Sequence, residues 1–192
     1  MREPAWRKLG SIGLCAMRDF SGQFGFTIIE LMVTLLVGAI LLSIAVPSFR
    51  NFVQDSRLTT ESNSLVYSLN LARSEAVKRD GGVKVCASSD GSSCGGTWAQ
   101  GWIVCAPASD CTTVLHATPA VATGNTVDDL LSGASDLTFS AGGQTGQAYR
   151  FVFCDVRGAS DARDVEVDVI GRVQAASNAG QDLSGHALAG CA

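Results

Sequence analysis

One carboxylate, that of Glu30, stands at the start of an apolar run in this 192-residue chain. The run contains no charged residue from Leu31 to Val46. A charge inside a bilayer costs at least a few kcal/mol and is usually kept for a function that supplies it with a partner. A carboxylate near a helix N-terminus is also stabilised by the helix dipole. We therefore expect Glu30 either to pair with a positive charge or to stabilise only the start of a helix.

A membrane-length helix must carry this acid. The segment from Phe26 to Phe49 spans 24 residues, and at about 1.5 Å per residue it is long enough to cross a hydrocarbon core of about 30 Å. An ordinary secretory signal peptide is the alternative, because Ser43-Ile44-Ala45 has the pattern of a cleavage site. Such a peptide carries positive charge next to its apolar run, whereas the nearest charge here is Glu30. The charge pattern favours the membrane helix.

The stretch FGFTIIEL, residues 24–31, and the apolar run after it resemble the class III signal of type IV prepilins and type II secretion pseudopilins. The resemblance implies that a prepilin peptidase cuts between Gly25 and Phe26 and methylates the new N-terminal Phe26. It also implies that Glu30 neutralises the N-terminal amine of an adjacent subunit, and that Pro47 is the family's helix-bending proline. Translation from Met17 would leave a shorter leader, without Cys15.

The helix is expected to continue beyond Pro47 as an amphipathic segment that ends at Asp80-Gly81-Gly82. The segment Leu69–Arg79, LNLARSEAVKR, and residues 83–106 resemble the FimT/FimU/GspH group of minor pilins and pseudopilins. Apolar residues recur mostly every three or four positions and predict a packed face, formed by Phe49, Phe52, Val53, Leu58, Leu65, Val66, Leu69, Ala72 and Ala76.

The rest of the chain predicts antiparallel β structure, so the expected fold class is α+β, with one long helix packed on a β domain. Gly, Ser, Asn and Asp clusters separate six or seven short strands. The clearest are Val83–Ala87, Trp98–Ala106, Thr112–Ala117, Leu137–Ser140, Tyr149–Val156 and Arg163–Ile170. We expect four parts: a leader (1–25), a membrane and assembly half of the helix (26–49), an amphipathic half (50–79) and a periplasmic β domain (80–192).

An even number of cysteines follows the membrane segment, and in an oxidising periplasm this predicts disulfides. The six are Cys86, Cys94, Cys105, Cys111, Cys154 and Cys191. They allow 15 pairings, of which spacing favours 86 with 94, 105 with 111, and 154 with 191. A zinc site is the alternative. No C-x-x-C pair is present and His116 and His186 stand apart, so we expect no metal and no cofactor.

A DNA-binding role is the third interpretation that the resemblance raises. Some FimT proteins bind DNA through a Gly-Arg-x-Arg motif, and the matching residues here are Gly171-Arg172-Val173-Gln174. Gln174 replaces the second Arg. From Phe26 on, ten basic residues face sixteen acidic ones, a net charge of −6, whereas DNA affinity comes mostly from Lys and Arg that neutralise phosphates. A turn that leads into a last strand is the favoured explanation of Gly171-Arg172.

The function expected from these features is structural. The sequence contains no nucleophile-elbow, metal or carboxylate-pair pattern, so we do not expect an enzyme. The resemblance implies a minor pilin incorporated at or near the tip of a type IV pilus, anchored in the inner membrane with its β domain in the periplasm. The alternative is the H-type pseudopilin of a type II secretion system. The expected partners are other pilins or pseudopilins, the prepilin peptidase and the inner membrane, with DNA less favoured.

Overall fold

The computed structural model describes residues 25–188 and residues 190 and 191. The leader before Gly25, with Met17 and Cys15, lies outside the described residues. The chain divides after Ile44 into two units, and each is described by itself. In the first unit, residues 28–44 are helical, and nearly all of their side chains are exposed.

Helix α1 spans Ile28–Arg79 and continues through Pro47. The helix ends in a Schellman motif. Asp80 adopts a left-handed conformation with φ of 48°, the N–H of Gly81 donates to the carbonyl of Ala76 at 3.2 Å, and the N–H of Asp80 donates to that of Val77 at 3.4 Å. The predicted long helix is confirmed, and so is its end at the Asp80-Gly81 pair.

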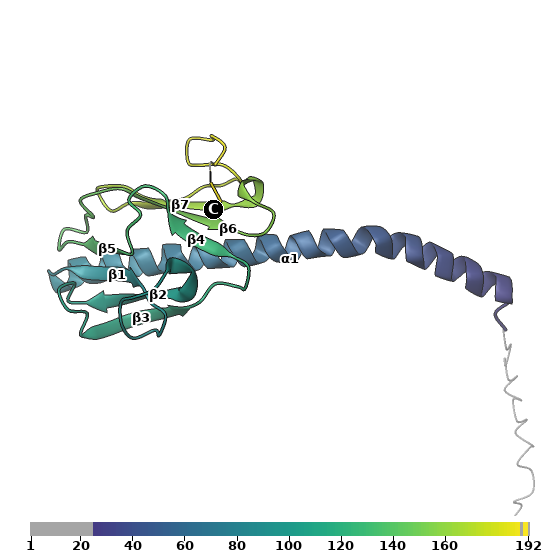
Figure 1. Ribbon diagram of the computed structural model, residues 1–192, viewed down its shortest axis with the longest axis horizontal. Helices are drawn as coiled ribbons and strands as arrows, with labels where there is room; N and C mark the ends of the chain where they lie inside the picture. Colours follow the sequence, from purple (N-terminus) through teal and green to yellow (C-terminus); the bar gives the residue numbers. More distant parts are fainter. Residues whose placement is uncertain (1–24, 189, 192) are drawn as a thin grey trace, which may run out of the picture. The chain divides into compact units, whose positions relative to one another are not determined.

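Eight strands form two antiparallel four-stranded sheets within the second unit (Figure 1). The first sheet has the order β3-β2-β1-β5, with β1 at Val83–Ala87, β2 at Gly101–Ala106, β3 at Thr113–Pro119 and β5 at Asp136–Phe139. The second has the order β4-β6-β7-β8, with β4 at Thr126–Asp129, β6 at Tyr149–Cys154, β7 at Arg163–Val167 and β8 at Val173–Ala175. Two 3-10 turns, η1 at Trp98–Gln100 and η2 at Ala159–Asp161, complete the elements.

The C-terminal part of α1 packs against both sheets and forms one core with them (Figure 1). Its fully buried side chains are Leu58, Leu65, Leu69, Ala72 and Ala76. Ser68 is buried among them because its hydroxyl accepts a hydrogen bond of 3.0 Å from the indole N–H of Trp102 on β2. The Trp102 ring in turn meets Phe153 of β6 edge to face, with centroids 6.5 Å apart, and so links the two sheets.

Two predicted features of the helix and first strands are wrong in detail. Phe49 and Phe52 remain 67% and 68% exposed, so the buried face of α1 starts at Leu58 rather than directly after Pro47. Residues Trp98–Gln100 were predicted as strand but form the 3-10 turn η1. The side-chain oxygen of Gln100 accepts a hydrogen bond from the N–H of Thr97 and stabilises this turn. The aromatic residue that suggested a strand instead fills the core.

Two predicted features of the later strands also differ. β7 ends at Val167 instead of Ile170, because the carboxylate of Asp168 accepts the N–H groups of Ile170 and Arg172 and forms a turn. β4 was not predicted, since its sequence Thr-Val-Asp-Asp is half acidic and breaks the usual strand composition. Gly171-Arg172 does lead from a turn into a last strand, β8.

Candidate assembly site

The residues expected to be processed lie immediately before α1. Gly25, Phe26 and Thr27 precede the helix, and the Phe26 side chain is 77% exposed. The Thr27 hydroxyl accepts the N–H of Glu30 at 3.2 Å, and the Thr27 carbonyl accepts the N–H of Leu31 at 3.1 Å. Thr27 is therefore the N-cap, and Glu30 occupies the first turn at the third helical position, where an acid is favourable.

Sequence reasoning missed the role of Thr27, although the signal was present. Thr27-Ile28-Ile29-Glu30 has the Thr-x-x-Glu pattern of a capping box, in which the cap hydroxyl and the later acid serve the same helix end. The hydroxyl half of that box is formed here. Glu30 thus has a helix-start setting, one of the two roles expected for it, and its ion pair with a neighbouring subunit stays a prediction.

The apolar side chains that follow Glu30 are exposed along the whole first unit. Leu31 is 54% exposed, Leu36 62% and Ile44 68%, and an 18-residue stretch of α1 has a mean hydropathy of 2.5 with none of it buried. By length and composition α1 is able to cross a membrane. A continuous apolar surface of this kind has to be covered by lipid or by other apolar helices.

Three disulfides close the β structure. They join Cys86 to Cys94, Cys105 to Cys111 and Cys154 to Cys191, which are the pairs that the spacing favours. The first two flank β1 and β2, and the third ties the C-terminal tail to β6. Cys154 packs with Val152, Ala162 and Leu188 in a small core of its own. These links hold the loops around the first sheet and the tail in place.

Among the described residues, one group of potential ligand atoms lies close enough together to hold a metal ion. The sulfur atoms of Cys86, Cys94, Cys105 and Cys111 all lie within 4.8 Å of one another. Each of these sulfurs is already bonded to a second sulfur, whereas a zinc ligand has to be a free thiolate. The proximity is therefore explained by two disulfides packed against each other.

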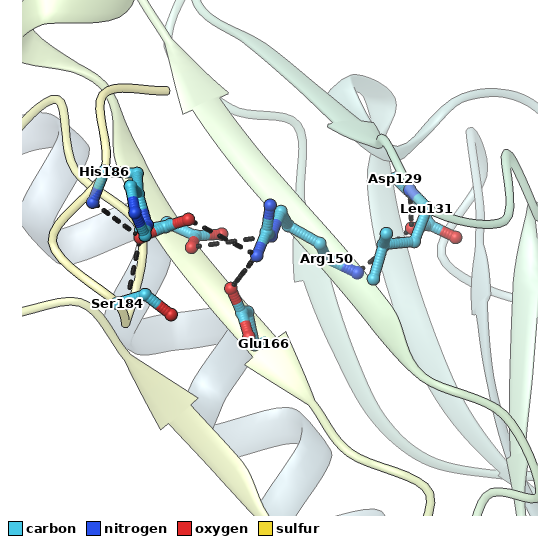
Figure 2. A network of polar contacts seen from close by, with 8 residues as sticks. Asp129, Leu131, Arg150, Glu166, Ser184 and His186 are labelled. Atoms are coloured by element: carbon cyan, nitrogen blue, oxygen red, sulfur yellow. Dashed lines mark hydrogen bonds and ion pairs between the residues drawn. The ribbon is translucent and has the colours of Figure 1, made fainter. Parts of the chain in front are cut away.

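Arg150 of β6 is the centre of a polar network on the second sheet (Figure 2). Its Nε donates to Glu166 of β7 at 2.8 Å, and its guanidinium lies 3.8 Å from the carboxylates of both Asp164 and Asp182. Asp182 accepts the N–H groups of Ser184 and His186, each at 2.9 Å. The network fastens the C-terminal loop to the sheet, and these hydrogen bonds keep the pKa of Asp182 below its ordinary value.

Asp164 is the member of this network with an unusual ionisation. Its side chain is fully buried, and neither carboxylate oxygen has a hydrogen-bond partner among the described residues. Burial, together with the nearby charge of Glu166, raises the pKa of Asp164 to about 7, while Arg150 acts in the opposite direction. The residue is poised to change charge near neutral pH, and no sequence pattern indicated this.

The candidate DNA-binding residue, Arg172, lies at the turn before β8. Its Nε is 3.3 Å from the Asp168 carboxylate, and its side chain is 61% exposed. Gly171 has φ of 77°, and a Cβ at this position would collide with the carbonyl of Gly143. The Gly-Arg pair therefore has a structural role in closing this turn, and the one cation of the motif already faces a carboxylate.

Comparison with known proteins agrees with this architecture. The family model "Type II transport protein GspH" matches residues 61–171, and the model of the prokaryotic N-terminal methylation motif matches residues 20–46. No curated protein sequence matches the chain.

Solved structures of two proteins are similar to parts of this chain. The type IV minor pilin FimU of Pseudomonas aeruginosa, in two crystal forms, is 24% identical, with TM-scores of 0.55 and 0.54; the matches cover 64% and 65% of this chain and 90% and 98% of those chains. The minor pseudopilin EpsH of the Vibrio cholerae Type 2 Secretion System is 13% identical over 62% of this chain and 95% of that one, with a TM-score of 0.48. At these identities the likeness to FimU concerns the fold.

The GspH model covers more than half of the chain, and the methylation motif covers the helix start at which Thr27 and Glu30 meet. Over 64% of its length this chain has a fold similar to that of FimU. The chain therefore belongs to the GspH family of type II transport proteins, with the prokaryotic N-terminal methylation motif at its N-terminal end.

Proposed function

We propose that this chain is a minor pilin of a type IV pilus, incorporated at or near the tip and needed for pilus assembly. One observation carries the proposal: the exposed apolar surface of α1 starts directly after a capped helix end that holds Glu30 in its first turn. Such a surface fits a lipid bilayer before assembly and the apolar helices of neighbouring subunits after it.

The proposed maturation starts with removal of the leader, residues 1–25, by the prepilin peptidase, which also methylates Phe26. Residues 26–49 then anchor the chain in the inner membrane, residues 50–79 form the amphipathic half of the helix, and residues 80–192 form the periplasmic domain. The new N-terminal amine of Phe26 carries a positive charge. The Glu30 carboxylate of one subunit forms an ion pair with this amine in an adjacent subunit. In a low-dielectric environment such a pair is stronger than in water.

The fold shared with the minor pilin FimU supports the pilus assignment. The family description as a type II transport protein supports the second candidate, an H-type pseudopilin of a type II secretion system. Both functions use the same membrane helix and the same kind of periplasmic domain.

A deletion strain of the native host separates the two functions. Surface pili are sheared and quantified, and secretion of a type II substrate is measured in the same cultures, with a plasmid copy of the gene as the complementation control. We expect loss of pili with unchanged secretion. Loss of secretion with normal pili would assign the chain to the pseudopilus, and normal pili with normal secretion would reject both functions.

A further inference from the structure

Strand β3 is an uncovered edge of the first sheet, as its outermost place in Figure 1 shows. It has seven residues, Thr-Val-Leu-His-Ala-Thr-Pro, and carries neither Asp, Glu, Lys nor Arg. The other edges among the described residues are shorter: β4 and β5 have four residues and contain Asp, and β8 has three. Proteins protect exposed edges by shortness, charge, proline and β-bulges. β3 has neither shortness nor charge, although its pairing with β2 shifts register between Val104 and Cys105 and it ends at Pro119.

The register of the sheet shows which main-chain groups of β3 face outward. The carbonyl of Gly101 accepts the N–H of Ser88, so the main chain of Gly101 faces β1, and that of Ile103 faces the same way by alternation. Gly101 pairs with Pro119 and Ile103 with Ala117. Gly101–Pro119 and Ile103–Ala117 are therefore non-hydrogen-bonded pairs, in which the main-chain groups of the β3 residue point away from β2. Ala117, which is exposed, thus presents its N–H and carbonyl to solvent.

Two hollows flank this edge, one on each face of the sheet. The first, about 520 Å³, lies between β3 and α1 and is lined from the helix by Thr60, Asn63, Ser64 and Tyr67. The second, about 430 Å³, lies between the end of β3 and the loop 88–91. Successive side chains of an added strand point to opposite faces, so they would enter the two hollows in turn.

The lining of the hollows indicates the chemistry of the occupant. The first has no charged residue, and its Tyr67 is 58% exposed, with its ring edge to face on His116 at 5.3 Å. The second contains Asp90, whose carboxylate already accepts the N–H groups of Ser92 and Ser93, each at 2.8 Å. An extended segment without acidic residues fits this surface, with an apolar or aromatic side chain against Tyr67.

We propose that β3 docks an extended, acid-free segment of a different pilin-like subunit, which adds to the first sheet as a further strand; this inference rests on the proposed function. A second copy of this chain fits less well, because the chain from Phe26 on has a net charge of −6 and two copies repel each other. The main-chain groups of β3 give affinity, and the two hollows select the side chains.

The test uses the full-length chain in living cells of the native host. The photoreactive residue p-benzoylphenylalanine replaces Tyr67, and cross-linked peptides are mapped by mass spectrometry. The same probe at Val156, which is 79% exposed and lies outside both hollows, is the control position. Ala117→Pro removes the outward N–H without removing a bond to β2, and Ala117→Ser is the matched variant that keeps it. Asn63→Arg fills the first hollow from an exposed helix position and leaves β3 unchanged.

We expect the Tyr67 probe to link to one short segment of another pilin-like subunit. The yield should fall at least about tenfold in Ala117→Pro and Asn63→Arg, a loss of about 1.4 kcal/mol or more in binding, and should be unchanged in Ala117→Ser. No cross-link, an equal yield in Ala117→Pro and Asn63→Arg, or a link to a second copy of this chain would each overturn the proposal. Presence of the unmodified chain in sheared filaments tests the proposed function separately, because it does not depend on the cross-link.

Discussion

The hydroxyl of Thr27 accepts a hydrogen bond from the main-chain N–H of Glu30 at 3.2 Å. This bond caps the helix through the hydroxyl of Thr27 and the backbone of Glu30, without using the Glu30 carboxylate. The Glu30 carboxylate is therefore not needed for the helix cap that the structure shows. Helix capping and charge pairing can be separated by substitution, because Thr27 supplies the first and Glu30 would supply the second.

Glu30→Gln should abolish assembly while the chain is still processed and inserted. Glutamine keeps the size of glutamate and its preference for this helix position but has no charge. Because a charge pair in the membrane is worth a few kcal/mol, we expect the number of pili to fall at least about tenfold in a deletion strain that carries this variant. Piliation is measured by shearing and by electron microscopy.

Two control variants sharpen this comparison. Thr27→Ala removes the cap, which costs about 1 kcal/mol of helix stability, and should reduce piliation far less than Glu30→Gln does. Glu75→Gln replaces an acid that pairs with Lys78 and Arg79 at the other end of the same helix and should leave piliation normal. Normal piliation in Glu30→Gln with a defect in Thr27→Ala would show that Glu30 serves only the helix start.

The stability of the chain should depend on the ionisation of Asp164. Burial raises its folded pKa to about 7, above its value in the unfolded chain, so the neutral form is favoured by folding. The stability that Asp164 contributes is complete below about pH 4 and is lost as the pH rises to about 7. Asp164→Asn should thus be more stable than the unmodified chain at pH 8, by at most about 4 kcal/mol, and show no such advantage at pH 4.

Thermal unfolding midpoints of both proteins between pH 4 and pH 8 measure this difference. Asp182, whose pKa is lowered, acts with the opposite sign but is present in both proteins, so the comparison isolates Asp164. A gap between the two midpoints that stays constant with pH would contradict the assignment of a raised pKa to Asp164.

The three disulfides should contribute unequally to stability. The Cys154–Cys191 bond spans a sequence separation of 37, whereas the Cys105–Cys111 bond spans 6. In the chain-entropy estimate, loss of the longer loop costs about 4 kcal/mol and loss of the shorter about 2 kcal/mol. Double serine variants of each pair, unfolded with guanidinium chloride, give the two values. A larger cost for the 105–111 pair would contradict this order.

DNA binding by the chain should be weak or absent. Arg172 already faces Asp168 at 3.3 Å, and the chain from Phe26 on is negatively charged, so few counterions are released from DNA. A mobility-shift assay with duplex DNA and the detergent-solubilised full chain is expected to show no shift, and Gln174→Arg is expected to strengthen any residual binding. Tight binding that salt weakens and Arg172→Ala abolishes would make DNA uptake the leading function.

Most local features of the fold could be predicted from sequence, whereas the long-range ones, apart from the Cys154–Cys191 disulfide, could not. The helix and its Asp80-Gly81 end follow from periodicity and turn residues, and Val83–Ala87 is a strand as its composition indicates. The division into two sheets depends on contacts between distant segments, such as Trp102 against Phe153. Composition also misleads where one side chain redirects the backbone, as Asp168 does at the end of β7.

The candidate site shows the same division. Gly25, Phe26 and Glu30 could be proposed as site residues because a short contiguous motif carries them. The cap formed by Thr27 could have been predicted, since its Thr-x-x-Glu pattern is also local. The raised pKa of Asp164 could not, because it comes first from burial in the folded chain, and because Arg150 of β6 and Asp182 of the C-terminal loop approach the side chain only after folding. β3 is an edge strand because, in the described sheet, it pairs only with β2. This pairing also joins separate segments and could not be predicted from local sequence.

The N-terminal mass of the chain in sheared filaments is the most direct test that it is a processed filament subunit. Purified filaments are digested, and the N-terminal peptide of this chain is sequenced by mass spectrometry. We predict that it starts at Phe26 with a methylated amine, and that Gly25→Val accumulates uncleaved precursor in the membrane and removes the chain from filaments. An N-terminus at Val46, after the Ser43-Ile44-Ala45 pattern, or absence of the unmodified chain from both pili and pseudopili would contradict the account.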